Sequence, residues 1–178
     1  MFLDGGLTFN SAVGTAQAIT ATADSAGIID VTGAGSGNSP AMINGPGAAN
    51  TALGSDYGLG DSVATPHVFV TITAVGTSTN TLTIAVKAAP DNGSYGQGTY
   101  TTLVQTPAIV ENTLAVGDII DIPLPPTRYT EAEALPRFYK LTYTASAALT
   151  TSVLANLVLN PESATAGGVL YNNNFIAV

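Results

Sequence analysis

The sequence has no cysteine and no tryptophan, a single histidine, and only four lysine and arginine residues among its 178 residues. Without cysteine the chain can form neither a disulfide framework nor a thiolate site, so the fold has to rely on packing or oligomerisation. A catalytic or zinc-binding role for His67 would need convergent partners, and there is no second histidine or cysteine to supply them. We therefore expect His67, which follows Pro66 at the start of an apolar run, to be a strand-edge residue.

Charge is scarce as well. Charged residues make up 9% of the chain, against about 25% in ordinary globular domains. Threonine, serine, asparagine, alanine and glycine must cover the surface instead. This suits a protein partly buried by neighbours, because lysine and glutamate are depleted at interface cores; the alternative is a neutral β-rich surface with no partner. The formal net charge of −8 argues against nucleic acid as a partner, since binding phosphates needs clustered cations.

Long hydrophobic runs are also missing. No run approaches the roughly 20 apolar residues of a membrane-spanning helix, and the N-terminal "MFLDGG" has an acid where a signal peptide would carry basic residues. We expect no membrane partner and a protein that is soluble where it is made.

What the sequence does contain is strand alternation. In "HVFVTITAV" (67–75), Val68, Val70 and Ile72 share one face and Thr71 and Thr73 lie opposite, which is the period-two pattern of a half-buried strand. Further runs of this kind are "AITATA" (18–23), "GIIDV" (27–31), "TLTIAVK" (81–87), "YTTLVQT" (100–106), "GDIIDIPL" (117–124), "RFYKLTYTA" (137–145) and "SVLANLVL" (152–159). Their regular spacing predicts an all-β fold, a jelly-roll-like antiparallel β-sandwich with long loops and extended terminal arms.

The connections are predicted from the residues between these runs. "GTSTN" (76–80) reads as a hairpin loop, and Pro123 should place its strand at a sheet edge or a bulge because proline cannot donate to a central ladder. Helix is expected only as one turn around 130–135. We expect a single domain over residues 1–160, with an N-terminal arm (1–12) and a long Gly/Ala-rich loop (33–66), followed by a C-terminal extension (161–178) that docks on a neighbour.

Paired carboxylates can carry out hydrolysis without other functional residues. Asp118 and Asp121 are three residues apart, which on a strand sends them to opposite faces. Glu131 and Glu133 could face the same way, but they precede a proline-bounded loop, and a solvated turn is favoured over a calcium or acid/base site.

Two loops resemble ligand sites only superficially. "GAGSG" (33–37) lacks the Lys-Ser/Thr ending of a phosphate-binding loop, and no helix pattern follows it. In "PDNGSYGQG" (90–98), Asp91 and Asn92 could begin a cation site, but Asn-Gly is also a leading turn signal, and we favour the turn. We predict no catalytic residue, no metal and no cofactor.

The segment "RFYKLTYT" (137–144) holds two of the four cations. Alternation predicts that Tyr139, Leu141 and Tyr143 face the core, while Phe138, Lys140 and Thr142 project outward and Arg137 sits at the strand entrance. The cations are expected to meet acids of this chain or of a neighbour, because no nucleophile or base lies beside them.

The order of these motifs resembles that of the small cement (decoration) proteins on the capsids of tailed bacteriophages. In that family a chain starting Met-x-Leu-Asp reaches an Arg-aromatic-x-basic-Leu-x-Tyr strand and closes on a Leu-Val-Leu strand. The matching residues here are Met1, Leu3 and Asp4, then Arg137, Phe138, Lys140, Leu141 and Tyr143, then Leu157, Val158 and Leu159. The stretch near 38–55 and the tail after Asn160 depart from the pattern.

The resemblance implies a homotrimer on the outer capsid surface of the virion, made in the bacterial host cytoplasm, which clamps neighbouring major capsid subunits and has no enzymatic activity. The residues predicted to contact the trimer or the capsid are Leu3, Asp4, Arg128, Arg137, Lys140, Tyr171, Phe175 and Ile176. The alternative is a carbohydrate-binding β-sandwich, a receptor-binding or adhesin-type domain, that uses loop tyrosines at 57, 95, 100 or 129; the lack of tryptophan counts modestly against it.

Overall fold

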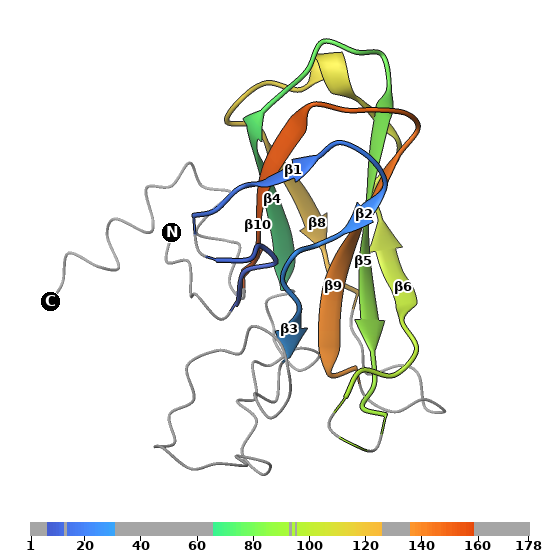
Figure 1. Ribbon diagram of the computed structural model, residues 1–178. Helices are drawn as coiled ribbons and strands as arrows, with labels where there is room; N and C mark the ends of the chain where they lie inside the picture. Colours follow the sequence, from blue (N-terminus) through green and yellow to red (C-terminus); the bar gives the residue numbers. More distant parts are fainter. Residues whose placement is uncertain are drawn as a thin grey trace, which may run out of the picture.

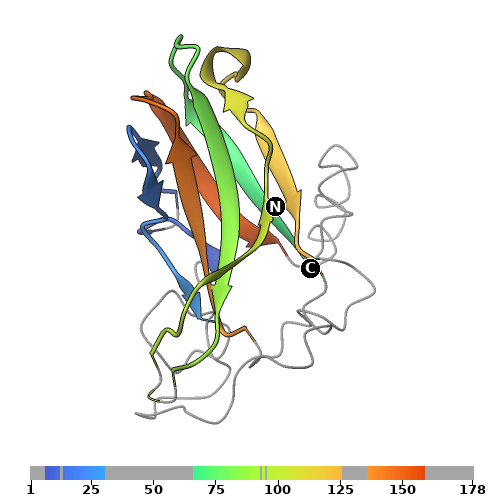
Figure 2. The same ribbon diagram turned by 90° about the vertical axis from the view of Figure 1, so that its right-hand side faces the viewer.

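The two sheets of the protein lie face to face as an antiparallel β-sandwich (Figures 1 and 2). The computed structural model describes residues 7–12, 14–30, 66–92, 94, 96–125 and 136–158. One sheet has the strand order β1-β10-β4-β8; the other has the order β2-β9-β5-β6, with β3 also pairing with β9 and β7 with β5. The predicted all-β antiparallel sandwich is confirmed.

The strands are short in the first part of the chain and longer at the centre of each sheet. The first sheet consists of β1 (Gln17–Ile19), β10 (Thr151–Val158), β4 (His67–Ala74) and β8 (Ile119–Pro123). The second consists of β2 (Ala23–Asp24), β3 (Ile29–Asp30), β9 (Phe138–Ala145), β5 (Thr81–Ala89), β6 (Thr101–Gln105) and β7 (Ile109–Val110). A 3-10 helix, η2 (Glu111–Thr113), follows β7. Among the residues that the structure describes, no helix is long and apolar enough to cross a membrane.

Strand pairing is nested along the chain. β1 pairs with β10, β2 and β3 pair with β9, β4 pairs with β8, and β5 pairs with β6, all antiparallel. The predicted hairpin at 76–80 is therefore wrong, because β4 and β5 belong to different sheets and the loop crosses between them. Alternation reports which face of a strand is buried, but not which strand lies beside it.

Both sheets bury the faces that alternation predicts. Val68, Val70 and Ile72 of β4 and Leu141 of β9 are at most 1% exposed and belong to one core cluster. Tyr143 is also fully buried there. Its hydroxyl has no hydrogen-bond partner within the described residues, and burial raises the pKa of the phenol.

Two predicted runs differ in detail from the strands, and one short strand was not predicted. The run 18–23 splits, because the chain leaves the first sheet after β1 and joins the second at β2. The run 27–31 yields only the two-residue β3, and the short β7 has no counterpart among the predicted strands. Pro123 ends β8, an edge strand, as predicted.

The second half of the predicted N-terminal arm packs on the sandwich of the same chain. Thr8 forms a bridge with Asn156 of β10, and the Phe9 amide donates to the Ala155 carbonyl at 2.9 Å. Leu7 and Phe9 are buried in the core cluster. Through these contacts the segment lies beside β10 at the edge of the first sheet, with its apolar side chains turned into the core. Most of the predicted loop (33–65), the helical turn (130–135) and the C-terminal extension (161–178) lie outside the described residues.

Candidate functional site

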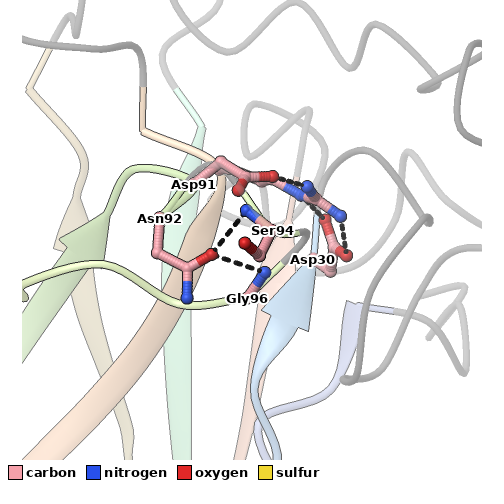
Figure 3. Close-up of polar contacts among 6 residues, drawn as sticks. Asp30, Asp91, Asn92, Ser94 and Gly96 are labelled. Carbon is pink, nitrogen blue, oxygen red and sulfur yellow. Dashed lines mark hydrogen bonds and ion pairs between the residues drawn. The ribbon is translucent and has the colours of Figure 1, made fainter.

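Arg137 is the centre of a buried ion cluster at the entrance to β9. The guanidinium donates from Nε to Asp30 Oδ1 and from Nη2 to Asp30 Oδ2, both at 3.0 Å, and Nη1 donates to Asp91 Oδ2. Arg137 is 7% exposed and Asp30 is 0% exposed. Figure 3 shows the carboxylates of Asp30 and Asp91 converging from two different segments.

Strand pairing explains why these groups meet. β9 lies between β3 and β5, so that Phe138 pairs with Asp30 on one side and with Ala89 on the other. The Arg137 amide donates to the Ala89 carbonyl at 2.9 Å, and Asp91 follows two residues later. The cluster therefore joins three strands of the second sheet at one end.

The electrostatics of the cluster keep arginine charged. Hydrogen bonds to Asp30 raise the pKa of Arg137, burial opposes them, and the negative charges of Asp30 and Asp91 add to the increase. The guanidinium carbon also lies 4.7 Å from the centre of the Phe138 ring. Phe138 was predicted to project outward, but it is 0% exposed; alternation assigns the face of the sheet and cannot foresee that a neighbouring side chain covers it. A guanidinium in this state can hold carboxylates but cannot exchange a proton.

The loop after Asp91 is closed by Asn92. Its side-chain Oδ1 accepts hydrogen bonds from the backbone amides of Ser94 at 2.8 Å and Gly96 at 3.1 Å (Figure 3). The backbone amide of Asn92 donates to the Gly96 carbonyl at 3.0 Å. This agrees with the predicted turn. Asn92 Oδ1 is engaged by these amides, and Asp91 Oδ2 accepts from Arg137. No group of three or more histidine, cysteine or acidic side chains gathers as a metal site within the described residues.

Lys140 lies on the outer face of the second sheet rather than with Arg137. Its Nζ donates to Asp24 Oδ2 at 2.6 Å and lies 4.2 Å from the centre of the Tyr100 ring, while the Thr142 hydroxyl donates to Asp24 Oδ1 at 2.7 Å. Lys87 is the direct cross-strand neighbour of Lys140. Among the described residues, the charges of both lysines therefore act on the same carboxylate, that of Asp24.

These contacts shift two pKa values in opposite directions. Burial raises the pKa of Asp24, but hydrogen bonds from Lys140 and Thr142 and the charges of both lysines outweigh it, so that the pKa lies below the ordinary value. Burial, with the charge of Asp24, raises the pKa of Tyr100 to about 12. Lys140 thus lies over one face of the Tyr100 ring, and the Tyr100 hydroxyl donates to Gln97 Oε1 at 3.0 Å.

Glu111 forms a second buried polar centre, which was not predicted from the sequence. It is 1% exposed and accepts hydrogen bonds from the Ser78 hydroxyl at 2.5 Å, the Thr150 amide at 2.7 Å and the Thr151 hydroxyl at 2.9 Å. Burial raises the pKa of Glu111, but these donors outweigh burial and lower it to about 2. Its partners are 33 to 40 residues away in the chain, so no local motif could have revealed the site.

His67 and Asp121 are in hydrogen-bond contact across β4 and β8, with Nδ1 2.5 Å from Oδ1. His67 is the first residue of β4, in agreement with its predicted place at a strand end, and packs edge-on against Phe69 with ring centres 6.1 Å apart. Asp118 instead accepts from the Ala115 amide at 2.7 Å. Asp118 and Asp121, which the sequence predicted not to pair, therefore have different partners.

Of the residues predicted to contact the trimer or the capsid, the structure describes Arg137 and Lys140. Each is ion-paired to an acid of the same chain, and they occupy separate clusters. The others, Leu3, Asp4, Arg128, Tyr171, Phe175 and Ile176, lie outside the described residues. No protein-family model matches the chain, and no curated protein sequence matches it.

Proposed function

We propose that the protein is a structural cement, or decoration, protein of a tailed bacteriophage, which binds the outer capsid surface as a homotrimer and clamps neighbouring major capsid subunits. The observation that carries the proposal is where the family-like motifs lie in the fold. The first motif coincides with β9, a central strand of the second sheet. Arg137 immediately precedes this strand, and the other motif residues lie within it: Phe138, Lys140, Leu141 and Tyr143.

The other motif and the strand order add to this support. "LVL" (157–159) begins within β10, the strand that pairs with both β1 and β4. The nested pairing of first with last strands, divided over two sheets, is what a jelly-roll arrangement requires. This pairing pattern supports the proposal that the sandwich is jelly-roll-like, as expected of a cement protein.

The polar groups support a scaffold rather than a reactive site. Arg137, Lys140 and Glu111 have their hydrogen-bond partners within the chain. A body held by internal ion pairs and hydrogen bonds can present fixed surfaces to several neighbours at once. Three modest contacts from one rigid trimer become intramolecular after the first, which can raise avidity by about 10²–10⁴. The assembled shell is then stabilised by mass action, because the clamp binds assembled capsid rather than free subunits.

Binding to capsids tests the proposal directly. Purified protein is mixed with heads assembled from the major capsid protein of the same phage, and occupancy is measured by sedimentation and cryo-electron microscopy. We expect saturable density outside the shell at threefold positions and heads that withstand higher temperature. Heads that neither bind the protein nor gain stability would contradict the proposal.

The oligomeric state is a separate test. Size-exclusion chromatography with light scattering should give the mass of a trimer of the 17.8 kDa chain. A strict monomer that still decorates heads would contradict only the trimer. A glycan array is the matching test of the carbohydrate-binding alternative, and a specific hit would reverse the ranking.

A further inference from the structure

Among the described residues, β8 is an edge strand that pairs on one side only. It lies at the margin of the first sheet beside β4, and within the described residues no strand pairs with its outer side (Figure 2). The Leu124 amide donates toward β4, to the Pro66 carbonyl, at 2.9 Å. Since backbone groups alternate in direction along an antiparallel strand, the N–H and C=O groups of Ile119 and Asp121 point away from the sheet.

This edge also carries the exposed apolar side chains. Val116 and Ile119, the large hydrophobic residues exposed in the described part of the chain, are 65% and 57% exposed; Ile119 is the first residue of β8, and Val116 lies three residues before it. Native proteins usually protect sheet edges with short strands, bulges or polar residues. β1, β2, β3 and β7 have three residues or fewer, and the equally long β6 carries exposed threonines and pairs with β5 through a bulge. β8 carries Pro123 at its end and the exposed Asp121, which are protections of this kind, but its first residue, Ile119, is an exposed apolar side chain.

The charge of the edge indicates what could pair with it. Asp118 is exposed, and the side chain of Asp121, whose Oδ1 contacts His67 within the sheet, is 37% exposed. A second copy of this chain would bring two more carboxylates to the same edge, and its own net charge is −8. An extended segment with a basic side chain would be attracted instead, because opposite charges facing one another across strands are favourable and like charges are not.

We propose that β8 is the acceptor edge for β-strand addition by an extended segment of a partner protein. The segment pairs with the outward N–H and C=O groups of Ile119 and Asp121. It carries an aliphatic residue opposite Ile119 and a lysine or arginine opposite Asp121. Main-chain hydrogen bonds supply the affinity of such additions and alternate side chains the specificity. Pro123, which has no N–H, limits the length of the added strand. The proposal does not depend on capsid binding.

A blocked hexapeptide, Thr-Val-Lys-Val-Val-Thr, is the probe. In an antiparallel register its lysine lies opposite Asp121 and a valine opposite Ile119. Titrated into the ¹⁵N-labelled full chain, it should shift the amide signals of residues 116–122 and few others. Asp121→Asn should weaken binding roughly two- to fivefold, as expected for an exposed ion pair. Ile119→Thr, which keeps a β-branched residue, should also weaken binding.

Matched controls separate strand addition from general stickiness. Asp24→Asn, on the opposite sheet, should leave peptide binding unchanged, and the peptide with glutamate in place of lysine should bind more weakly. N-methylation of the peptide at alternate amides should weaken binding by about tenfold per lost hydrogen bond. The proposal is overturned by the absence of shifts at millimolar peptide, by equal binding of the N-methylated peptide, or by self-association of the chain through β8.

Discussion

At the end of the sandwich where β9 begins, Asp30 is buried against the guanidinium of Arg137 (Figure 1). At the opposite end, Glu111 is buried among hydroxyl and amide donors, which carry no charge. Both carboxylates are at most 1% exposed. The first is compensated by a cation that stays charged at any ordinary pH. The second is stabilised by neutral dipoles that favour its ionised form. The two ends should therefore fail under different conditions.

The pH dependence of Glu111 has a defined sign. Its pKa in the folded protein is about 2, below the ordinary value of 4.5. A carboxylate with a lowered pKa stabilises the fold above its unfolded pKa, and this contribution is lost as pH falls. The Glu111 end should lose its stabilisation between about pH 4.5 and pH 2.

The largest effect is expected from Arg137→Met. Removal of the cation breaks its ion pairs with the buried Asp30 and with Asp91, and breaking a buried ion pair in this way typically costs about 3–5 kcal/mol. Urea unfolding at pH 7 measures the loss. Lys140→Met, which removes an exposed pair, is the control and should cost less than about 1 kcal/mol. Adding Asp30→Asn to Arg137→Met should recover part of the loss. Equal losses for the two single variants would contradict the prediction.

Glu111→Gln should come next, at about 2–3 kcal/mol at pH 7, because one carboxylate oxygen that accepts hydrogen bonds becomes an amide that donates. The difference from the parent protein should shrink as pH falls from 5 to 2. Thermal unfolding over this range measures it. A difference that is constant with pH would show that ionised Glu111 is not the source of the stabilisation.

Gly76→Ala probes the same end by steric means. A Cβ atom at Gly76 would overlap the Thr150 hydroxyl and lie 2.7 Å from the carboxyl carbon of Glu111. We expect a loss of about 1–2 kcal/mol, typical of overpacking. Thr77→Ala, at an exposed neighbouring position, should be close to neutral. Adding Thr150→Ala to Gly76→Ala should recover stability if the clash is the cause.

Tyr143 extends the comparison to a buried polar group with no partner in the described structure. Tyr143→Phe removes only the hydroxyl, so it should be neutral or stabilising by up to about 1 kcal/mol, the opposite of the usual effect of core substitutions. Urea unfolding distinguishes these outcomes. A clear loss of stability would mean that the hydroxyl is hydrogen-bonded, for instance to a buried water.

The smallest expected effect concerns Asp24, the acid of the exposed cluster. Asp24→Asn should cost less than about 1 kcal/mol. It should also lower the pKa of Tyr100 from about 12, because the charge of Asp24 contributes to raising it. Ultraviolet phenol titration, with Tyr100→Phe to identify the signal, checks this. An unchanged titration would assign the whole increase to burial.

Alternation alone predicted the faces of the central strands correctly, as the buried Leu141 and Tyr143 show. It could not predict the neighbours of each strand, so the hairpin at 76–80 was wrong. The same limit hid the two buried acids. Asp30 and Glu111 are compensated by residues 107 and up to 40 positions away, and only strand pairing brings them together. The apolar Leu7 and Phe9 carried a detectable signal, since they alternate like strand residues.

The nesting of the strand pairs bears on how the chain is made. β4 is flanked by β10 and β8, and both follow it in the chain. During synthesis from the N-terminus, β4 has no neighbour in its own sheet until β8 has emerged, and β10 is the last strand of the sandwich to appear. Pairings between distant segments also make folding slow, on the order of milliseconds to seconds. The apolar "HVFVTITA" of β4 thus remains open to mispairing until nearly the whole sandwich has left the ribosome.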